Sequence, residues 1–88
     1  SWLVDGAMDI TELKKRFSFT ALPGEDEGDF ETLGGFVLDR FGHIPMAGEH
    51  FEWSGWRFEI MDMDRHRVDK VLLIPLPKAP AGTASDLK

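Results

Sequence analysis

A run of acidic side chains is the most conspicuous chemistry in this 88-residue sequence. Five carboxylates and no base lie between residues 22 and 31, namely Glu25, Asp26, Glu27, Asp29 and Glu31. Hard divalent cations prefer clustered oxygen ligands, so the run is a candidate weak site for Ca²⁺ or Mg²⁺. The spacing differs from an EF-hand loop, because Gly28 and Phe30 stand where oxygen ligands are needed. We interpret the segment first as a mobile, solvated loop, since like charges repel, and keep the cation site as the alternative.

No other pattern in the sequence predicts catalysis or a bound cofactor. The three histidines lack the spacing of a zinc motif, and His50 opposite Glu59 is interpreted as a surface pair. Ser54 has no supporting triad pattern. The sequence contains no Cys, which excludes disulfides and thiolate metal sites. We therefore predict that the domain is not an enzyme, has no catalytic residues and requires no cofactor, and we assign no cofactor-binding residue.

Charge and hydropathy narrow the classes of partner. Sixteen acidic and ten basic residues give a net charge of −6, which argues against a nucleic-acid partner. The longest apolar run, apart from a proline-containing extension, is Val71–Ile74, far short of the roughly 20 residues that span a bilayer. The sequence begins at Ser1 without Met and opens on an apolar segment. We therefore expect it to be a piece of a longer protein.

Two segments carry helix signals. Asp9–Phe17 is predicted to be an amphipathic helix that Asp9 caps, with Glu12 completing a capping box. A second helix is predicted from an N-cap at Thr32 to about Phe41, with Gly42 as its stop. Two glycines inside this helix, Gly34 and Gly35, each cost about 1 kcal/mol relative to Ala. We therefore expect the backbone to approach a neighbour or a ligand closely at that turn.

The second half of the sequence has the period of two that is typical of strands. A short strand is predicted over Trp2–Asp5, and a hairpin over Glu49–Trp53 and Trp56–Met61. Its predicted register pairs Trp53 with Trp56 and Phe51 with Phe58 on one face, and Glu52 with Arg57 and His50 with Glu59 on the other. A second hairpin turns at residues 64–67 into Val68–Ile74. Because Val71–Ile74 lacks alternation, this strand is predicted to be central and covered on both faces.

These elements predict an α+β fold. A short N-terminal strand and two helices pack on the apolar face of a mainly antiparallel sheet, built from a three-stranded meander. Residues 1–76 form the predicted domain, and residues 77–88, rich in Pro, Ala, Gly, Thr and Ser, a disordered tail. A domain this small has only a few kcal/mol to spare, so support from a partner domain or a dimer is expected.

Three short motifs occur in a fixed order, Thr32-Leu33-Gly34-Gly35, Gly42-His43-Ile44-Pro45 and Gly48-Glu49. Together they resemble the T-x-G-G, G-x-I-P and G-E core of the CorC/HlyC transporter-associated domain. The resemblance covers roughly residues 2–76. It implies an α+β fold grouped with FAD-binding domains, although the sequence carries no flavin fingerprint.

The resemblance also implies a context. Family members form the cytoplasmic C-terminal part of hemolysin-like proteins, after a membrane domain and a pair of CBS domains, in proteins linked to magnesium and cobalt efflux. The implied partners are therefore the CBS and membrane domains of the same parent chain, at the cytoplasmic face of the cell membrane. The family has no agreed functional residues, so none is transferred to this sequence.

The leading hypothesis is a non-enzymatic regulatory domain of a divalent-cation efflux transporter, acting through domain docking and sensing cation through the acidic segment. The second hypothesis is a module that binds a small molecule, a flavin or an adenine nucleotide through the aromatic face and Gly34-Gly35. The third is a structural dimerisation domain that exposes Trp53 or Trp56 at a homodimer interface.

Overall fold

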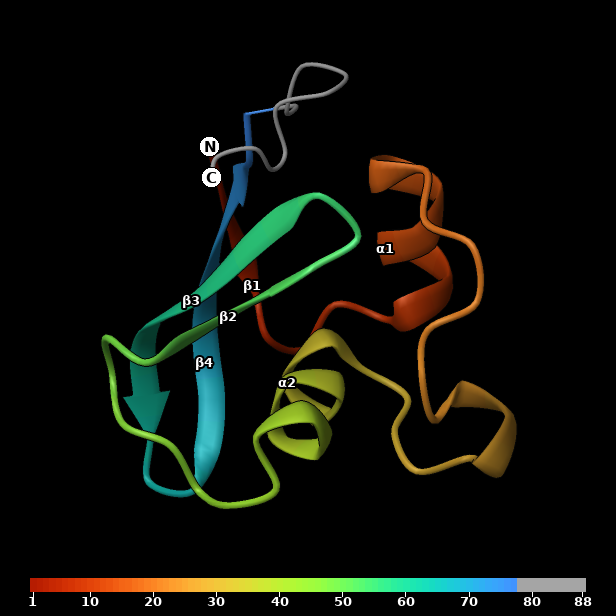
Figure 1. Cartoon of the computed structure of the whole chain (residues 1–88). Coiled ribbons are helices and arrows are strands. Elements are labelled where there is room, and N and C mark those ends of the chain that lie inside the picture. The colour runs from red at the N-terminus through yellow and green to blue at the C-terminus, as the bar shows by residue number, and fades with distance from the viewer. Residues whose placement is uncertain (78–88) are drawn as a thin grey trace, which may run out of the picture.

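The computed structural model describes residues 1–77. In chain order the elements are β1 (Trp2–Asp5), α1 (Ile10–Phe17), a 3₁₀ turn η1 (Glu25–Glu27), α2 (Leu33–Phe41), β2 (His50–Trp53), β3 (Trp56–Asp64) and β4 (Arg67–Pro75). The strands form one antiparallel sheet in the order β1-β4-β3-β2. Both helices lie on the same side of this sheet (Figure 1). The predicted α+β architecture is confirmed.

Strand β1 extends the predicted meander. It pairs antiparallel with β4, from Trp2 opposite Leu73 to Asp5 opposite Lys70. The sheet therefore has four strands rather than the three of the meander, with β4 inside it and β1 at one edge.

Helix α1 begins as predicted but lacks the predicted capping box. The Asp9 carboxylate accepts a hydrogen bond from Thr11 N at 2.7 Å, so the N-cap is confirmed. The Glu12 carboxylate instead accepts from Arg16 Nε at 2.7 Å, one turn further on. An opposite charge four residues away competes with the backbone for this side chain.

Helix α2 has both predicted boundaries. Thr32 Oγ1 accepts a hydrogen bond from Gly35 N at 3.2 Å, and Gly42 ends the helix in the left-handed conformation with φ 72°. The Gly42 N–H donates to the carbonyl of Leu38. A glycine in this conformation avoids the steric penalty that a Cβ atom brings.

The first turn of α2 contacts backbone rather than a ligand. Gly34 N donates to Gly6 O at 2.8 Å, and Gly6 N donates to Asp69 O at 2.8 Å. A Cβ atom on Gly34 would lie 3.1 Å from Gly6 O and Val68 O, and one on Gly6 would lie 2.0 Å from Val68 O. We call this junction of β1, α2 and β4 the glycine contact, and define it by Gly6, Gly34 and Val68. The expected close approach is thus to a neighbouring strand.

The hairpin registers agree with the predicted pairing. Phe51 lies opposite Phe58 and Trp53 opposite Trp56, and the rings of Phe51 and Phe58 stack with centroids 4.9 Å apart. Phe58 is fully buried and Phe51 is half-buried. On the other face Arg57 Nη2 donates to Glu59 Oε1 at 3.1 Å, two residues along its own strand. Within residues 1–77 Arg57 therefore forms its ion pair with Glu59, not with the cross-strand Glu52.

Strand β4 is central as predicted, but the helices of the described residues 1–77 cover only one of its faces. Val71 and Leu73 are fully buried beneath the helices. Leu72 and Ile74 are half-buried on the opposite side, where neither helix lies (Figure 1). The prediction of two covered faces is wrong, because both helices pack on the face of Val71 and Leu73. Leu72 and Ile74 on the other face are apolar but only half-buried. We call the uncovered side of the sheet the open face.

Two further predictions concern the ends of the domain and the membrane. Apart from Pro77, the predicted disordered tail lies outside the described residues, and the boundary at residue 76 stays a prediction. Neither α1 nor α2 has the length and apolar character that crossing a bilayer requires, within the described part of the chain.

Candidate functional site

The acidic segment is folded back onto α1 at one point. Glu25 Oε2 accepts from Lys14 Nζ at 2.5 Å, and Glu25 Oε1 accepts from Leu22 N at 3.0 Å. The short turn η1 follows, between Gly24 and Gly28 in left-handed backbone with φ 89° and 71°. The segment is therefore tied to α1 by a charged contact that its own composition does not reveal.

The remaining acidic side chains do not converge. Asp26, Glu27, Asp29 and Glu31 are all exposed. Among residues 1–77 no group of three or more metal-binding side chains is placed to hold an ion. The hydrogen bond from Lys14 and then that from Leu22 N lower the pKa of Glu25, although burial acts in the opposite direction. Glu25 is thus already paired with the Lys14 ammonium. The five-residue cation site stays a prediction.

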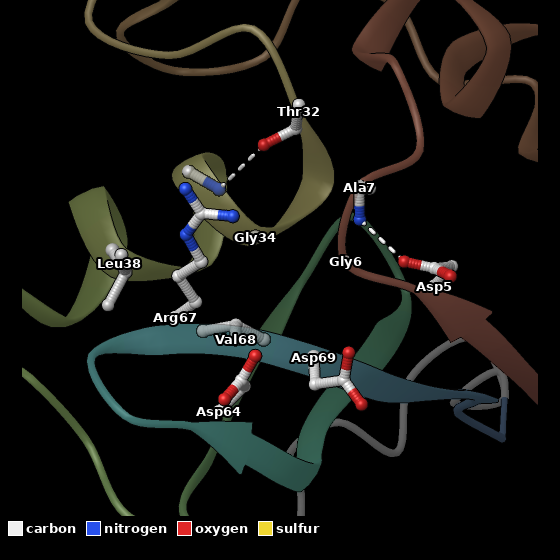
Figure 2. Close-up of a pocket in the computed structure, with 11 residues that line it drawn as sticks. Asp5, Gly6, Ala7, Thr32, Gly34, Leu38, Asp64, Arg67, Val68 and Asp69 are labelled. Carbon is white, nitrogen blue, oxygen red and sulfur yellow. Dashed lines mark hydrogen bonds between the residues drawn. The ribbon is translucent and has the colours of Figure 1, made fainter.

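A cavity of about 450 Å³ lies at the start of α2 (Figure 2). Its lining includes Gly34 and Gly35 from α2, and Asp64, Arg67 and Asp69 from the second hairpin. Figure 2 shows Arg67 extending from β4 toward the first turn of α2. A basic side chain beside a helix N-terminus is an arrangement that could attract an anion.

The backbone N–H groups at this helix start are already used. Leu33 N donates to Met8 O at 2.9 Å, Gly34 N to Gly6 O at 2.8 Å and Gly35 N to Thr32 Oγ1 at 3.2 Å. A phosphate-binding helix start needs such groups to be free. The two glycines therefore serve packing, and they give the nucleotide hypothesis no support.

The aromatic face of the hairpin packs onto the core, to which Phe58 belongs. Phe36 of α2 packs edge-on against Phe51, Trp53 and Phe58, with ring centroids 5.5–6.0 Å apart. Trp53 and Trp56, the residues of the dimer hypothesis, are both half-buried. The exposed indole belongs to Trp2, which is 53% exposed. The aromatic face and the Gly34-Gly35 pair are not brought together in one site.

A groove of about 580 Å³ lies between β1 and α1. Trp2, Phe17 and Trp56 line it, and their rings contact one another edge-to-face with centroids 5.1–6.0 Å apart. The groove also includes Asp5 and Arg16. Sequence reasoning missed it, because Trp2 and Trp56 meet only when β1 adds to the sheet beside β4.

The motif residues between α2 and β2 organise a loop. Glu49 Oε2 accepts from Met46 N at 2.7 Å, and Glu49 Oε1 lies 3.4 Å from His43 Nε2. The Met46 N–H and then His43 lower the pKa of Glu49, against an opposing effect of burial. Pro45 is buried and Gly48 has φ 97°. The G-x-I-P and G-E motifs are therefore explained by a closed turn, without a ligand.

The family model of the transporter associated domain, CorC_HlyC, matches residues 1–77. The chain belongs to the CorC_HlyC transporter associated domain family. Over 86 residues it is 42% identical to the UPF0053 protein sll0260 of Synechocystis, and over 88 residues 33% identical to the polyamine export protein of Salmonella typhimurium. These alignments cover 98% and 91% of the chain. The chain spans only 19% of the length of either relative.

Solved structures share the fold. A CorC_HlyC domain from a Xylella fastidiosa hemolysin, in complex with Mg²⁺ and Mn²⁺, is 40% identical, with a TM-score of 0.73 over 85% of this chain and 86% of that one. A CorC_HlyC domain from Haemophilus ducreyi is 25% identical, with a TM-score of 0.76 over 88% and 97%. The four-stranded architecture is thus that of the family.

The Glu25 contact predicts a pH effect on stability. A carboxylate whose pKa is lowered on folding stabilises the fold above its unfolded value, near 4.5, and loses that contribution as the pH falls through its folded value. Glu25→Gln is therefore expected to lower the urea midpoint at pH 7 and to approach wild type at pH 3. Asp26→Asn, which removes an exposed charge from the same segment, is the matched control. If Glu25→Gln lowers the urea midpoint as much at pH 3 as at pH 7, the ionised Glu25 carboxylate is not the source of the stabilisation.

Proposed function

We propose that this domain is a non-enzymatic accessory domain of a longer membrane transport protein, and that it regulates transport by docking against neighbouring parts of that protein. The family match over residues 1–77 carries the proposal. The small share of each relative's length that the chain spans supports it, because most of each relative is available as a docking partner. A docked domain biases a transporter only if it binds one conformation better than the other.

The neighbouring parts in this proposal are a membrane domain and CBS domains, with the accessory domain at the cytoplasmic face of the cell membrane. A domain of the same fold comes from a CBS domain protein of Porphyromonas gingivalis, at 22% identity and a TM-score of 0.70. That likeness supports the fold alone. The CBS context rests on the family resemblance.

The cargo in this proposal is a cation, with Mg²⁺ or Co²⁺ as the first candidates. A polyamine is the second candidate, because a relative 33% identical over 91% of this chain is named a polyamine export protein. Polyamines and divalent metal ions are both multiply charged cations, but a polyamine spreads its charges along a flexible chain whereas a metal ion concentrates them on one strongly hydrated centre. Transport measurements must therefore include both.

Transport by the full-length parent protein tests the regulatory role. Deletion of the segment equivalent to residues 1–77 is expected to change the efflux rate of its cargo several-fold while leaving measurable transport, because an accessory domain shifts a conformational equilibrium. Efflux of Mg²⁺, Co²⁺ and spermidine is measured from cells with matched membrane levels of both proteins. Unchanged efflux of every cargo, or complete loss of transport at normal protein levels, would contradict an accessory role.

We also propose that the acidic segment binds Mg²⁺ or Ca²⁺ weakly, through Asp26, Glu27, Asp29 and Glu31 with Glu25 released from Lys14. The solved hemolysin domain in complex with Mg²⁺ and Mn²⁺, 40% identical to this chain, supports metal binding in the family. The exposure of four of the five carboxylates means that a partly hydrated ion could reach them.

Calorimetric titration with Mg²⁺, Ca²⁺ and Co²⁺ tests this site. Binding with a dissociation constant on the order of 10⁻³ M is expected, as for loops that are not pre-organised. The double variant Asp26→Asn, Asp29→Asn is expected to lose it, and Asp62→Asn, Asp64→Asn, with the same change of charge in β3, is expected to keep it. If the heat of titration equals that of dilution into buffer for all three ions, the acidic segment does not sense cations.

A further inference from the structure

Within residues 1–77, the outer side of β1 is an open edge of the sheet. Gly6 N donates to the directly opposite Asp69 O, which makes Gly6 and Asp69 a hydrogen-bonded pair. Such pairs alternate along an antiparallel ladder, so Val4 and Trp2 also bond to β4, whereas the N–H and C=O groups of Leu3 and Asp5 point away from it. The Asp5 carbonyl accepts from Met8 N at 3.0 Å. Within the described residues, Leu3 N–H, Leu3 C=O and Asp5 N–H are left to face outward.

The groove described above runs along this open edge. All four residues of β1 line it, and Met8, Arg16, Phe17 and Ser18 line its helical side. A sheet edge beside a helix, with an apolar groove between them, is the geometry in which domains bind an extended peptide as an added strand. Backbone groups of the edge then provide hydrogen bonds, and the groove receives every second side chain.

The side chains of β1 are more typical of an edge that binds an added strand than of an edge that is protected against pairing. Trp2 is 53% exposed on the helical side, and Leu3 is 60% exposed on the open face beside Leu72. Edge strands that avoid pairing are usually very short, or carry Lys, Pro or a bulge. Strand β1 is short, at four residues, but it has no Lys, Pro or bulge and holds only one charge, Asp5.

The charges favour a basic partner strand. Asp5 and Asp69 both lie near Lys70 Nζ, at 3.7 Å and 3.3 Å, so two carboxylates share one ammonium at this end of the edge. Arg16 in the groove is paired with Glu12 at 2.7 Å. A second copy of this chain would also carry a net charge of −6. The repulsion between two chains of like charge opposes self-association through this edge.

We propose that β1 is a docking edge, and that its occupant is an extended segment of the longer transport polypeptide in which aliphatic and basic residues alternate. The segment adds to the sheet as a strand beside β1, with aliphatic side chains over Trp2 and Phe17. This proposal rests on the proposed function, because it names the surface through which the domain docks. The relatives' length outside the matched region provides the chain that such a segment requires.

Peptide binding to the 88-residue chain tests the proposal. The probe is a pool of decapeptides that alternate Leu, Ile or Val with Lys or Arg, and the readout is the backbone amide spectrum. Binding is expected to shift the amides of Leu3 and Asp5 and to slow their hydrogen exchange. A second pool, N-methylated at every second residue, is the control, since it keeps the side chains and removes the strand-pairing donors; at least tenfold weaker binding is expected.

Leu3→Pro is the matched change in the protein. It removes an N–H that faces away from β4 and so leaves the β1–β4 ladder intact. It is expected to weaken peptide binding at least tenfold, whereas Met46→Ser, which alters an exposed apolar side chain outside the groove, is expected to leave binding unchanged. If Leu3→Pro fails to fold, the N-methylated pool with the wild-type chain still decides the question.

Several outcomes would overturn this proposal. The peptide pool does not bind, the N-methylated pool binds equally well, or the peptides shift only amides away from β1. Alternatively, sedimentation shows a dimer that Leu3→Pro dissociates. The last outcome would make a second copy the occupant. If deletion of the domain alters transport but the pool does not bind, the docking edge is wrong and the accessory role stands.

Discussion

The fold depends on a backbone contact that has no room for a side chain. Gly6 donates to Asp69 of β4 and accepts from Gly34 of α2, so one residue joins the edge strand, the central strand and the helix. The hydrogen bond from Leu33 N to Met8 O reinforces the junction. Because a Cβ atom at Gly6 would lie 2.0 Å from Val68 O, only glycine permits this approach. The contact holds the end of β1 against the first turn of α2.

This junction also decides which surfaces are available for function. The N–H groups in the first turn of α2 donate to Met8 O, Gly6 O and Thr32 Oγ1. The glycine-rich start of this helix therefore serves packing and not ligand binding. The same packing places β1 beside β4 and leaves its outer edge open, next to α1. The two proposed binding sites are therefore the edge of the sheet and the exposed acidic segment, and neither uses the glycines.

Most features determined by neighbouring residues could be predicted from the sequence, although the capping box at Glu12 could not because Arg16 binds that side chain, and features determined by distant residues could not. Thr32 and Gly42 mark the ends of α2 because caps act within one turn, and the β2–β3 register follows from its short turn and its aromatic pairs. The pairing of β1 with β4 joins opposite ends of the described chain, so no local pattern indicates it. The Lys14–Glu25 contact was missed for a similar reason, because a run of acids predicts repulsion until α1 places a cation beside it.

Equilibrium unfolding in urea of Gly6→Ala, compared with Gly28→Ala, tests the role of the glycine contact most directly. Gly28 has φ 71° and would place its Cβ atom in open space, so its substitution reports backbone strain alone, about 1–2 kcal/mol. We predict that Gly6→Ala lowers the free energy of unfolding by about 3 kcal/mol or more, since a crowded methyl group must displace the backbone of β4. A Gly6→Ala variant that unfolds no more easily than Gly28→Ala would contradict this account of the fold.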